Sequence, residues 1–289
     1  MKTVLITGSS NGFGYLTALT LARYGFKVWA SMREPNKKNK IKNEELRSLA
    51  NTENLDLHVV ELDVTNDTSV TALAAQFKDQ GEHLDVLINN AGVMYVGITE
   101  AYSIAQVQEQ FDTNFFGIVR TTKAFLPFLK MADDGLVINI SSLAGRLVFP
   151  YFGVYCSSKF ALEAYSEALR YELKPFGVGV SIIEPGPFAS GLLYSGPKEE
   201  DDAVLQTYGE MSGVPAAMLK SFGEFYQTED ALDPQLVPDD VLKLIVAPKE
   251  SRPIRQVTGI DYGTVEFNER TSTVQKNLIE NILQMQHLV

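Results

Sequence analysis

The chain has 289 residues, of which 45% are hydrophobic and 21% charged, as expected of a soluble globular protein with a sizeable core. Its net charge of -11 argues against a nucleic-acid backbone or an anionic membrane as the main partner. A single cysteine, Cys156, excludes an internal disulfide framework and suits a reducing compartment. No apolar run reaches the roughly 20 residues that a membrane helix needs, and MKTVLITGSS lacks the pattern of a signal peptide. We therefore expect a cytoplasmic protein with no membrane-inserted segment.

Six short apolar runs alternate with longer amphipathic stretches along the chain. The runs are rich in Val, Ile and Leu without strict polar alternation, which is typical of strands buried on both faces. Strands that alternate with helices predict a doubly wound α/β sheet of parallel strands. The predicted strands are TVLITG, KVWASM, LHVVELDV, DVLINNAG, GLVINISS and VGVSIIEPG.

A glycine-rich turn joins the first predicted strand to the first helix. Gly8, Gly12 and Gly14 in TGSSNGFG follow the spacing G-x-x-x-G-x-G. Such a turn lets the backbone approach a pyrophosphate, whose charge lies at the N-terminus of the following helix. The spacing differs from the common G-x-G-x-x-G fingerprint. A plain strand-to-helix turn therefore stays open as the alternative to a dinucleotide site.

The end of the second predicted strand, VWASMRE, bears on the choice between NAD and NADP. An acidic residue there hydrogen-bonds the adenosine ribose, whereas a basic residue accommodates the 2′-phosphate of NADP. Met32 stands at the acidic position and Arg33 follows it, with Ser31 as a further hydroxyl and two lysines nearby. The sequence therefore favours NADP over NAD. Glu34 weakens this case, and the alternative is that Arg33 is a solvated loop charge.

Seven short motifs occur in order over about the first two thirds of the chain. They are TGSSNGFG, LDV at 62–64, NNAG at 89–92, Asn114, ISS ending at Ser142, YCSSK at 155–159 and PGPFAS at 185–190. This series resembles the short-chain dehydrogenase/reductase family, and residues 141–186 are most similar to its hydroxysteroid- and retinol-dehydrogenase-like branch. The resemblance implies one Rossmann-type α/β domain over residues 1–289, with helices on both faces of the sheet.

The resemblance also implies a set of cofactor contacts. Asp63 is expected to bind the adenine amino group beside the Val64 backbone. Asn89, Ala91 and Gly92 are expected to stabilise the central strand and line the adenosine side. The backbone of 185–188 is expected to bind the nicotinamide carboxamide, and Ser190 keeps the hydroxyl of the threonine usual there. The expected cofactor-binding residues are Gly8, Ser10, Asn11, Gly12, Phe13, Gly14, Arg33, Asp63, Val64, Asn89, Ala91, Gly92, Tyr155, Lys159, Pro185, Gly186, Phe188 and Ser190.

Tyr155 and Lys159 lie four residues apart in a predicted helix, so they share one helix face. Such pairs are also common on helix surfaces, but the resemblance implies that Tyr155 is the acid/base of a hydride transfer. Lys159 is expected to lower the pKa of Tyr155 from its ordinary value near 10, as is the charge of the oxidised nicotinamide, and to hold the nicotinamide ribose. Ser142 is expected to donate to the substrate oxygen. Asn114 is expected to kink its helix and to hold a water that links Lys159 to solvent.

The substrate side of the site is expected to be apolar. Residues 191–236 interrupt the strand pattern with short apolar groups, and we expect a small helical lid there rather than a second domain. An apolar wall over the reacting carbon predicts a hydrophobic alcohol or ketone as substrate, with core packing as the alternative role of these side chains. The wall candidates are Leu143, Leu147, Phe149, Tyr151 and Phe152.

Three further features complete the sequence-based expectations. Glu184 is expected to be a structural carboxylate, and the three histidines have no metal-ligand spacing, so no metal is predicted. The last helix carries an apolar stripe, which is more often core than interface. We expect it to pack on the core, with a subunit contact or a flap over the substrate as alternatives. We expect a homo-oligomer, a dimer or tetramer, formed through other surfaces.

The sequence thus predicts an NADP(H)-dependent oxidoreductase that interconverts a carbonyl and an alcohol on an apolar small molecule. The alternative is a non-catalytic NADP(H)-sensing protein that uses the same fold to bind a partner. The presence of Asn114, Ser142, Tyr155 and Lys159 together argues against that alternative.

Overall fold

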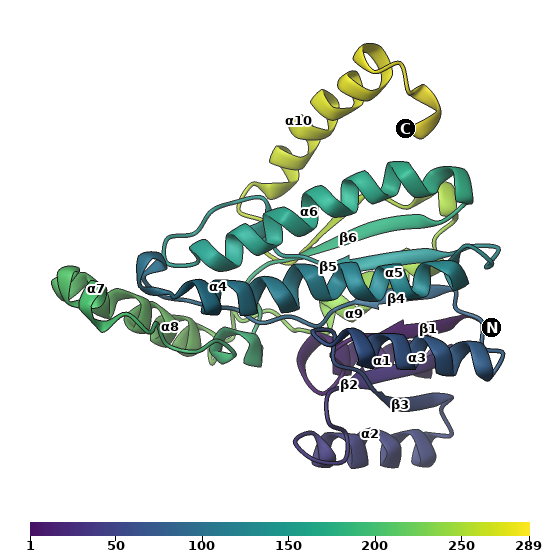
Figure 1. The fold of residues 1–289 in the computed structure, drawn as a ribbon, viewed down its shortest axis with the longest axis horizontal. Coiled ribbons are helices and arrows are strands. Elements are labelled where there is room, and N and C mark those ends of the chain that lie inside the picture. Colours follow the sequence, from purple (N-terminus) through teal and green to yellow (C-terminus); the bar gives the residue numbers. More distant parts are fainter.

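Seven parallel strands form one sheet in the computed structural model, which describes residues 1–289 (Figure 1). The strand order is β3-β2-β1-β4-β5-β6-β7, so the chain starts in the middle, winds to one edge and then crosses back to the other. This arrangement confirms the predicted doubly wound, Rossmann-type sheet. The strands are β1 (Thr3–Ile6), β2 (Lys27–Met32), β3 (Leu57–Glu61), β4 (Val86–Asn89), β5 (Leu136–Ile140), β6 (Gly179–Pro185) and β7 (Arg255–Thr258).

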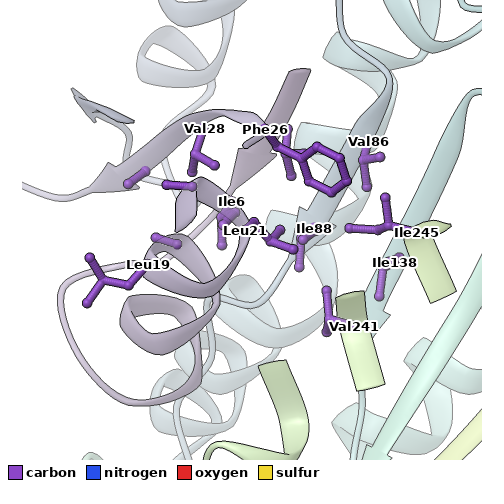
Figure 2. Packing of buried hydrophobic residues seen from close by; sticks show 14 of the residues in the cluster. Ile6, Leu19, Leu21, Phe26, Val28, Val86, Ile88, Ile138, Val241 and Ile245 are labelled. Atoms are coloured by element: carbon purple, nitrogen blue, oxygen red, sulfur yellow. The ribbon is translucent and has the colours of Figure 1, made fainter. Parts of the chain in front are cut away.

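Helices cover both faces of the sheet, because the strands are apolar on both sides. Side chains from α1, α2 and α9 pack with Ile6, Val28 and Ile88 in one core (Figure 2), and those from α3, α5 and α6 pack with Leu5 and Leu87 in the other. The helices are α1 (Gly12–Arg23), α2 (Lys40–Glu53), α3 (Asp67–Asp79), α4 (Ile104–Phe111), α5 (Gly117–Leu129), α6 (Gly153–Leu173), α7 (Asp202–Thr207), α8 (Val214–Phe225), α9 (Leu236–Val246) and α10 (Thr264–Asn277). None of them is long and apolar enough to cross a membrane.

Most of the strands and the helical insertion agree with the elements predicted from the sequence, and the last strand does not. The six predicted strands are all present, and the helical insertion at 191–236 contains α7 and α8, which lie beside α4 at one end of the molecule (Figure 1). The seventh strand, β7, was not predicted from the sequence. It has only four residues, RQVT, at the sheet edge and is only partly buried, so it lacks the continuous apolar run of a central strand.

The C-terminal helix does not pack on the core, so this prediction is wrong. α10 and the turns after it project from the body of the molecule (Figure 1). Ile282, Leu283 and Met285 are 65%, 47% and 42% exposed, and of the apolar stripe and its neighbours only Ile279 is buried. The physical reason is that other helices already cover both faces of the sheet.

Ending the chain after Thr273 is therefore expected to give a soluble, folded protein. Because Ile279 is the one buried residue in the segment removed, we expect the free energy of unfolding to fall by no more than about 3 kcal/mol, the value of one buried aliphatic side chain. Thermal unfolding by circular dichroism and light scattering would measure this. An insoluble or unfolded product would show that the helix is part of the core after all.

Candidate active site

A cavity of 630 Å³ opens where the carboxyl ends of the strands meet. In an open α/β sheet this edge, at the point where the strand order reverses, is where ligands bind. Residues at or just after the carboxyl ends of all seven strands contribute to its wall. They are residues 8 and 10–13 after β1, 32–33 at the end of β2, 62–65 after β3, 90–94 after β4, 140–144 at the end of β5, 185–188 at the end of β6 and Tyr262 after β7.

The glycine-rich turn is shaped for close backbone approach. Gly8 has φ +71° and Gly12 has φ +55°, which favour glycine, and a Cβ on Gly8 would lie 2.8 Å from the Cα of Ala91. α1 begins at Gly12, so its positive N-terminal end faces the cavity. Gly14 lies behind the turn, where a Cβ would meet the Gly8 carbonyl oxygen at 2.3 Å. Its expected cofactor contact is therefore corrected to a packing role.

The next two loops hold an acidic and a basic group on the cavity wall. Asp63 lies on the wall, and its Oδ1 accepts hydrogen bonds from the backbone N–H and the hydroxyl of Thr65 at 2.9 and 2.7 Å. Arg33 also lies on the wall, where it is exposed, and Lys38 stands beside it. Ser31 is fully buried outside the cavity, so its expected contact with a phosphate is not formed.

Asn90, rather than Asn89, faces the cavity at the end of β4. The Asn89 side chain is buried and bonds to Thr121, Thr122 and Asn139, which supports its expected role in the central strand but not a direct cofactor contact. Asn90 Nδ2 instead donates to the carbonyl oxygens of Thr7 and Gly8, which fixes the glycine-rich turn. Two adjacent asparagines cannot be told apart in this respect from the sequence alone.

Most of the expected cofactor residues share this single cavity. It also takes in polar residues that were not expected as cofactor contacts, among them Asn39, Thr65 and Asn90. The expected residues on its wall are Gly8, Ser10, Asn11, Gly12, Phe13, Arg33, Asp63, Val64, Ala91, Gly92, Tyr155, Lys159, Pro185, Gly186, Phe188 and Ser190.

Tyr155, Ser142 and Lys159 meet on the cavity wall. Ser142 follows β5, while Tyr155 and Lys159 come from the first two turns of α6, so two neighbouring elements present the three groups. Both α6 side chains are almost fully buried, at 4% and 5% exposure. Lys159 Nζ donates to the Ile140 carbonyl oxygen at 2.8 Å and lies 5.8 Å from the centre of the Tyr155 ring.

Burial controls the protonation of both groups. It raises the pKa of Tyr155 to about 12, although a hydrogen bond with Ser142 acts in the opposite direction. It lowers the pKa of Lys159 to about 8, against the attraction of the Glu163 carboxylate. The protein alone therefore does not lower the pKa of Tyr155 as the sequence led us to expect, because the cost of burying a phenolate exceeds the effect of the hydrogen bond with Ser142. The site holds a neutral phenol, which is a proton donor.

Asn114 lies behind this site rather than in it. A π-helical turn at Asp112–Phe116 separates α4 from α5, in agreement with the expected kink. The Asn114 side chain is fully buried and pairs with the backbone of Val93, at 2.8 and 2.9 Å, and donates to Ser158 Oγ at 3.0 Å. Both amide hydrogens thus brace α6 against the loop after β4. Its role in holding a water stays a prediction.

The other end of the cavity is apolar. Leu143, Phe149 and Phe152 line it as expected, but Leu147 and Tyr151 do not. The Tyr151 carbonyl oxygen instead accepts a hydrogen bond from the Gly97 N–H, so this part of the loop is anchored elsewhere. Sequence reasoning placed the insertion near the site but did not identify its contacts. The insertion and the loops near it add Met94, Leu192, Leu193, Phe222, Tyr226 and Tyr262.

The sheet, the glycine-rich turn at a helix N-terminus, and the Ser–Tyr–Lys group define a Rossmann-type dinucleotide-binding protein of the oxidoreductase class. The chain belongs to the short-chain dehydrogenase family, whose sequence model, described as short chain dehydrogenase, matches residues 2–201. The chain is 40% identical over 189 residues to 3-ketodihydrosphingosine reductase of Bacteroides thetaiotaomicron, a match that covers 65% of this chain and 64% of the relative. It is 36% identical over 271 residues to retinol dehydrogenase 8 of Bos taurus, with 90% and 82% covered.

These similarities confirm the retinol-dehydrogenase-like branch expected from the sequence. The alignments to three curated relatives, of which the reductase is one, span only 66%, 64% and 65% of those relatives' own length. Among solved structures, a short-chain dehydrogenase from Streptomyces avermitilis is 31% identical, with a TM-score of 0.75 and 96% of each chain covered. An alcohol dehydrogenase from Thermococcus sibiricus complexed with 5-hydroxy-NADP is 25% identical, with a TM-score of 0.71 and 90% and 97% covered.

Proposed function

We propose that this protein is an NADP(H)-dependent oxidoreductase that interconverts a carbonyl and an alcohol on an apolar small molecule. One observation carries the proposal: a dinucleotide cradle and the group Ser142, Tyr155 and Lys159 line the same cavity. A nicotinamide cofactor fits this wall, because Gly8 leaves the backbone bare, α1 points its N-terminus inward and Asp63 lies near the end of β3. When bound, the cofactor supplies or accepts the hydride.

The three side chains have complementary tasks. The Tyr155 hydroxyl holds a proton at neutral pH, because burial raises its pKa to about 12, so it protonates the oxygen of a carbonyl as this becomes an alcohol. The Ser142 hydroxyl lines the same cavity, and we propose that it donates to the same oxygen as charge develops there. Lys159 is fixed by the Ile140 carbonyl oxygen at 2.8 Å and places a positive charge beside the phenol.

The basic wall after β2 supports NADP rather than NAD. Arg33 and Lys38 are exposed on the cavity, and Met32 occupies the place of the acidic residue that would bind the ribose of NAD. The similar alcohol dehydrogenase from Thermococcus sibiricus is described with 5-hydroxy-NADP. These two facts together favour a 2′-phosphate bound at Arg33.

The apolar half of the cavity supports a hydrophobic substrate. Phe149 and Phe152 form one wall, and Phe222 and Tyr226 of the insertion face them. The relatives named above are a retinol dehydrogenase and a reductase of 3-ketodihydrosphingosine, both named for apolar molecules. We propose that residues 191–236 act as a lid over this half. A cytoplasmic location and a homo-oligomeric state stay predictions from the sequence.

A ketone panel tests the proposed function. The loss of NADPH absorbance in the near ultraviolet would be followed with linear, cyclic and polycyclic ketones and with retinal. We expect NADPH oxidation with apolar carbonyls and little with short hydrophilic ones, because the second half of the cavity is apolar. Tight NADPH binding without oxidation by any carbonyl would contradict the proposal and favour the non-catalytic sensor.

A further inference from the structure

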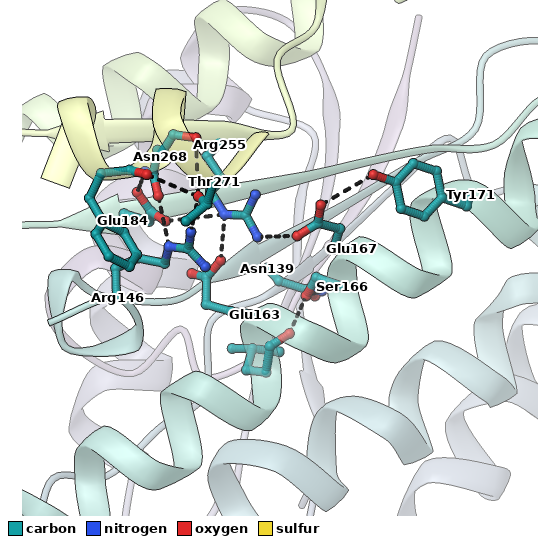
Figure 3. A network of polar contacts seen from close by, with 12 residues as sticks. Asn139, Arg146, Glu163, Ser166, Glu167, Tyr171, Glu184, Arg255, Asn268 and Thr271 are labelled. Carbon is teal, nitrogen blue, oxygen red and sulfur yellow. Dashed lines mark hydrogen bonds and ion pairs between the residues drawn. The ribbon is translucent and has the colours of Figure 1, made fainter. Parts of the chain in front are cut away.

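A buried network of charged side chains lies directly behind the catalytic helix (Figure 3). Arg255 on β7 pairs with Glu163 at 2.9 Å and with Glu167 at 2.7 Å, both on α6, and approaches Glu184 on β6 at 3.5 Å. The side chains of Arg255, Glu163 and Glu184 are only 4%, 2% and 0% exposed. Burial of this depth is rare for charged groups, because each ion loses its hydration.

Burial raises the pKa of both deeply buried carboxyls, Glu163 and Glu184, and the nearby Arg255 acts in the opposite direction on each. Burial and the neighbouring Glu163 carboxylate raise the pKa of Glu184 to about 8. Arg255 lies closer to Glu163 than to Glu184, and Asn268 donates to Glu184 Oε2 at 2.6 Å. Arg255 therefore favours a negative charge on Glu163 more strongly than on Glu184. This supports the structural role expected of Glu184.

Glu163 lies one helical turn beyond Lys159, on the same face of α6. Their proximity is visible at Gly145, where a Cβ would lie 2.9 Å from Glu163 Cγ, 3.2 Å from the Lys159 carbonyl oxygen and 2.8 Å from Ser141 Oγ. Ser141 itself lines the cavity. One carboxylate oxygen of Glu163, Oε1, has no hydrogen-bond partner within the protein. The Glu163 side chain thus lies beside the turn of α6 that carries Lys159.

We propose that Glu163 is a positioning residue for the reaction: its buried carboxylate, held in place by Arg255, is the counter-charge that keeps the Lys159 side chain an ammonium beside Tyr155. This inference rests on the proposed function, in which Lys159 acts on Tyr155. Without the carboxylate, the ammonium would be buried with only one carbonyl oxygen as its partner. A buried cation in such surroundings loses its proton more readily.

Other charged and titratable groups face this pair from each neighbouring element. On α6, no acidic residue is closer to Lys159 in sequence than Glu163. Cys156 is a neutral thiol, because burial raises its pKa. The groups are Tyr155, Cys156 and Glu167 on α6, Arg146 after Ser142, Glu184 on β6 and Arg255 on β7, while α10 presents the neutral Asn268 and Thr271 to Arg146 at 2.7 and 2.5 Å.

The variant Glu163→Gln tests the proposal, because it keeps the shape and removes the charge. The pKa of Lys159 would be measured by NMR of ¹³Cε-labelled lysine, with its signal assigned by its absence in Lys159→Arg. We expect the pKa of Lys159 to fall by about 1 pH unit or more, the effect of an opposite charge at close range. The alkaline limb of the profile of kcat/KM against pH is expected to move down by the same amount.

Glu167→Gln is the matched control. Glu167 binds the same guanidinium but lies two turns from Lys159, so a role limited to holding Arg255 predicts equal effects of the two variants. We expect no shift in the pKa of Lys159 in the control. An unchanged pKa in Glu163→Gln, or an equal shift in both variants, would overturn the proposal.

A second variant and the choice of an NMR titration keep the proposal testable if the first variant fails to fold or the protein shows no activity. If Glu163→Gln does not fold, Glu163→Asp takes its place, because aspartate keeps the charge but is shorter by one methylene. We expect a smaller fall in the pKa of Lys159 in this variant. No fall would overturn the proposal. The NMR titration needs no substrate. If the wild-type protein oxidises no NADPH but Glu163→Gln shows the expected pKa shift, the proposed function is refuted while the effect of Glu163 on the charge of Lys159 is confirmed.

Discussion

Replacement of Tyr155 by phenylalanine is expected to lower turnover by about 10²- to 10⁴-fold, the usual contribution of a general acid, while NADPH binding is retained. The phenol lies on the cavity wall beside Ser142 and Lys159. Because burial raises its pKa, the phenol stays protonated at neutral pH and can donate its proton. Phenylalanine keeps the packing of the ring and removes only the hydroxyl. Steady-state turnover and the binding of NADPH, followed by intrinsic fluorescence, would separate the two effects.

Two comparisons make this experiment specific. Lys159→Ala is expected to lose turnover and also to weaken NADPH binding, because Lys159 lies on the same wall and is proposed to hold the nicotinamide ribose. Tyr151→Phe is the matched control, since this tyrosine lies outside the cavity, and its turnover is expected to stay at the wild-type level. More than a few per cent of residual activity in Tyr155→Phe would refute the assignment of the acid.

Arg33→Ala is expected to narrow the preference for NADPH over NADH by about 1.5–3 kcal/mol, or about 10- to 150-fold, the range for a hydrogen bond to a charged group. Arg33 is exposed on the cavity wall next to Lys38, and its backbone carbonyl oxygen is fixed by Asn39 at 2.6 Å. The loss should fall on NADPH alone, because only this cofactor carries the 2′-phosphate. Fluorescence titration of both cofactors would measure the gap.

Lys37→Ala serves as the control for overall charge. This lysine is exposed near Arg33 but does not line the cavity, so its replacement is expected to change the cofactor preference far less. Equal affinity of the wild-type protein for NADPH and NADH would show that Arg33 is a solvated loop charge, the alternative that the sequence left open.

The parts of the fold that the sequence predicted are those with a strong local pattern. The continuous apolar runs predicted six strands, because a strand buried on both faces cannot be polar on either. The edge strand β7 has no such run and was missed. The last helix was assigned to the core because an apolar stripe has the same period whether it packs on a sheet or projects from it, and only the occupancy of the sheet faces separates the two.

In the candidate site, too, some features could be predicted from the sequence and others could not. The family resemblance implied that Ser142, Tyr155 and Lys159 act together, and the structure brings them onto one cavity wall. Spacing could not show that Asn90 rather than Asn89 faces the cavity, because only the structure shows that β4 ends at Asn89. Nor could it predict that burial raises the pKa of Tyr155, because desolvation depends on the whole three-dimensional packing.

Transfer of deuterium from labelled NADPH tests the central claim most directly. NADPH with two deuterium atoms at C4 of the nicotinamide would be incubated with an apolar ketone and the wild-type protein, and the product alcohol analysed by mass spectrometry. A hydride-transferring oxidoreductase predicts one deuterium on the carbinol carbon of each alcohol, and almost no alcohol with Tyr155→Phe. NADPH that binds but gives no labelled alcohol would contradict the account.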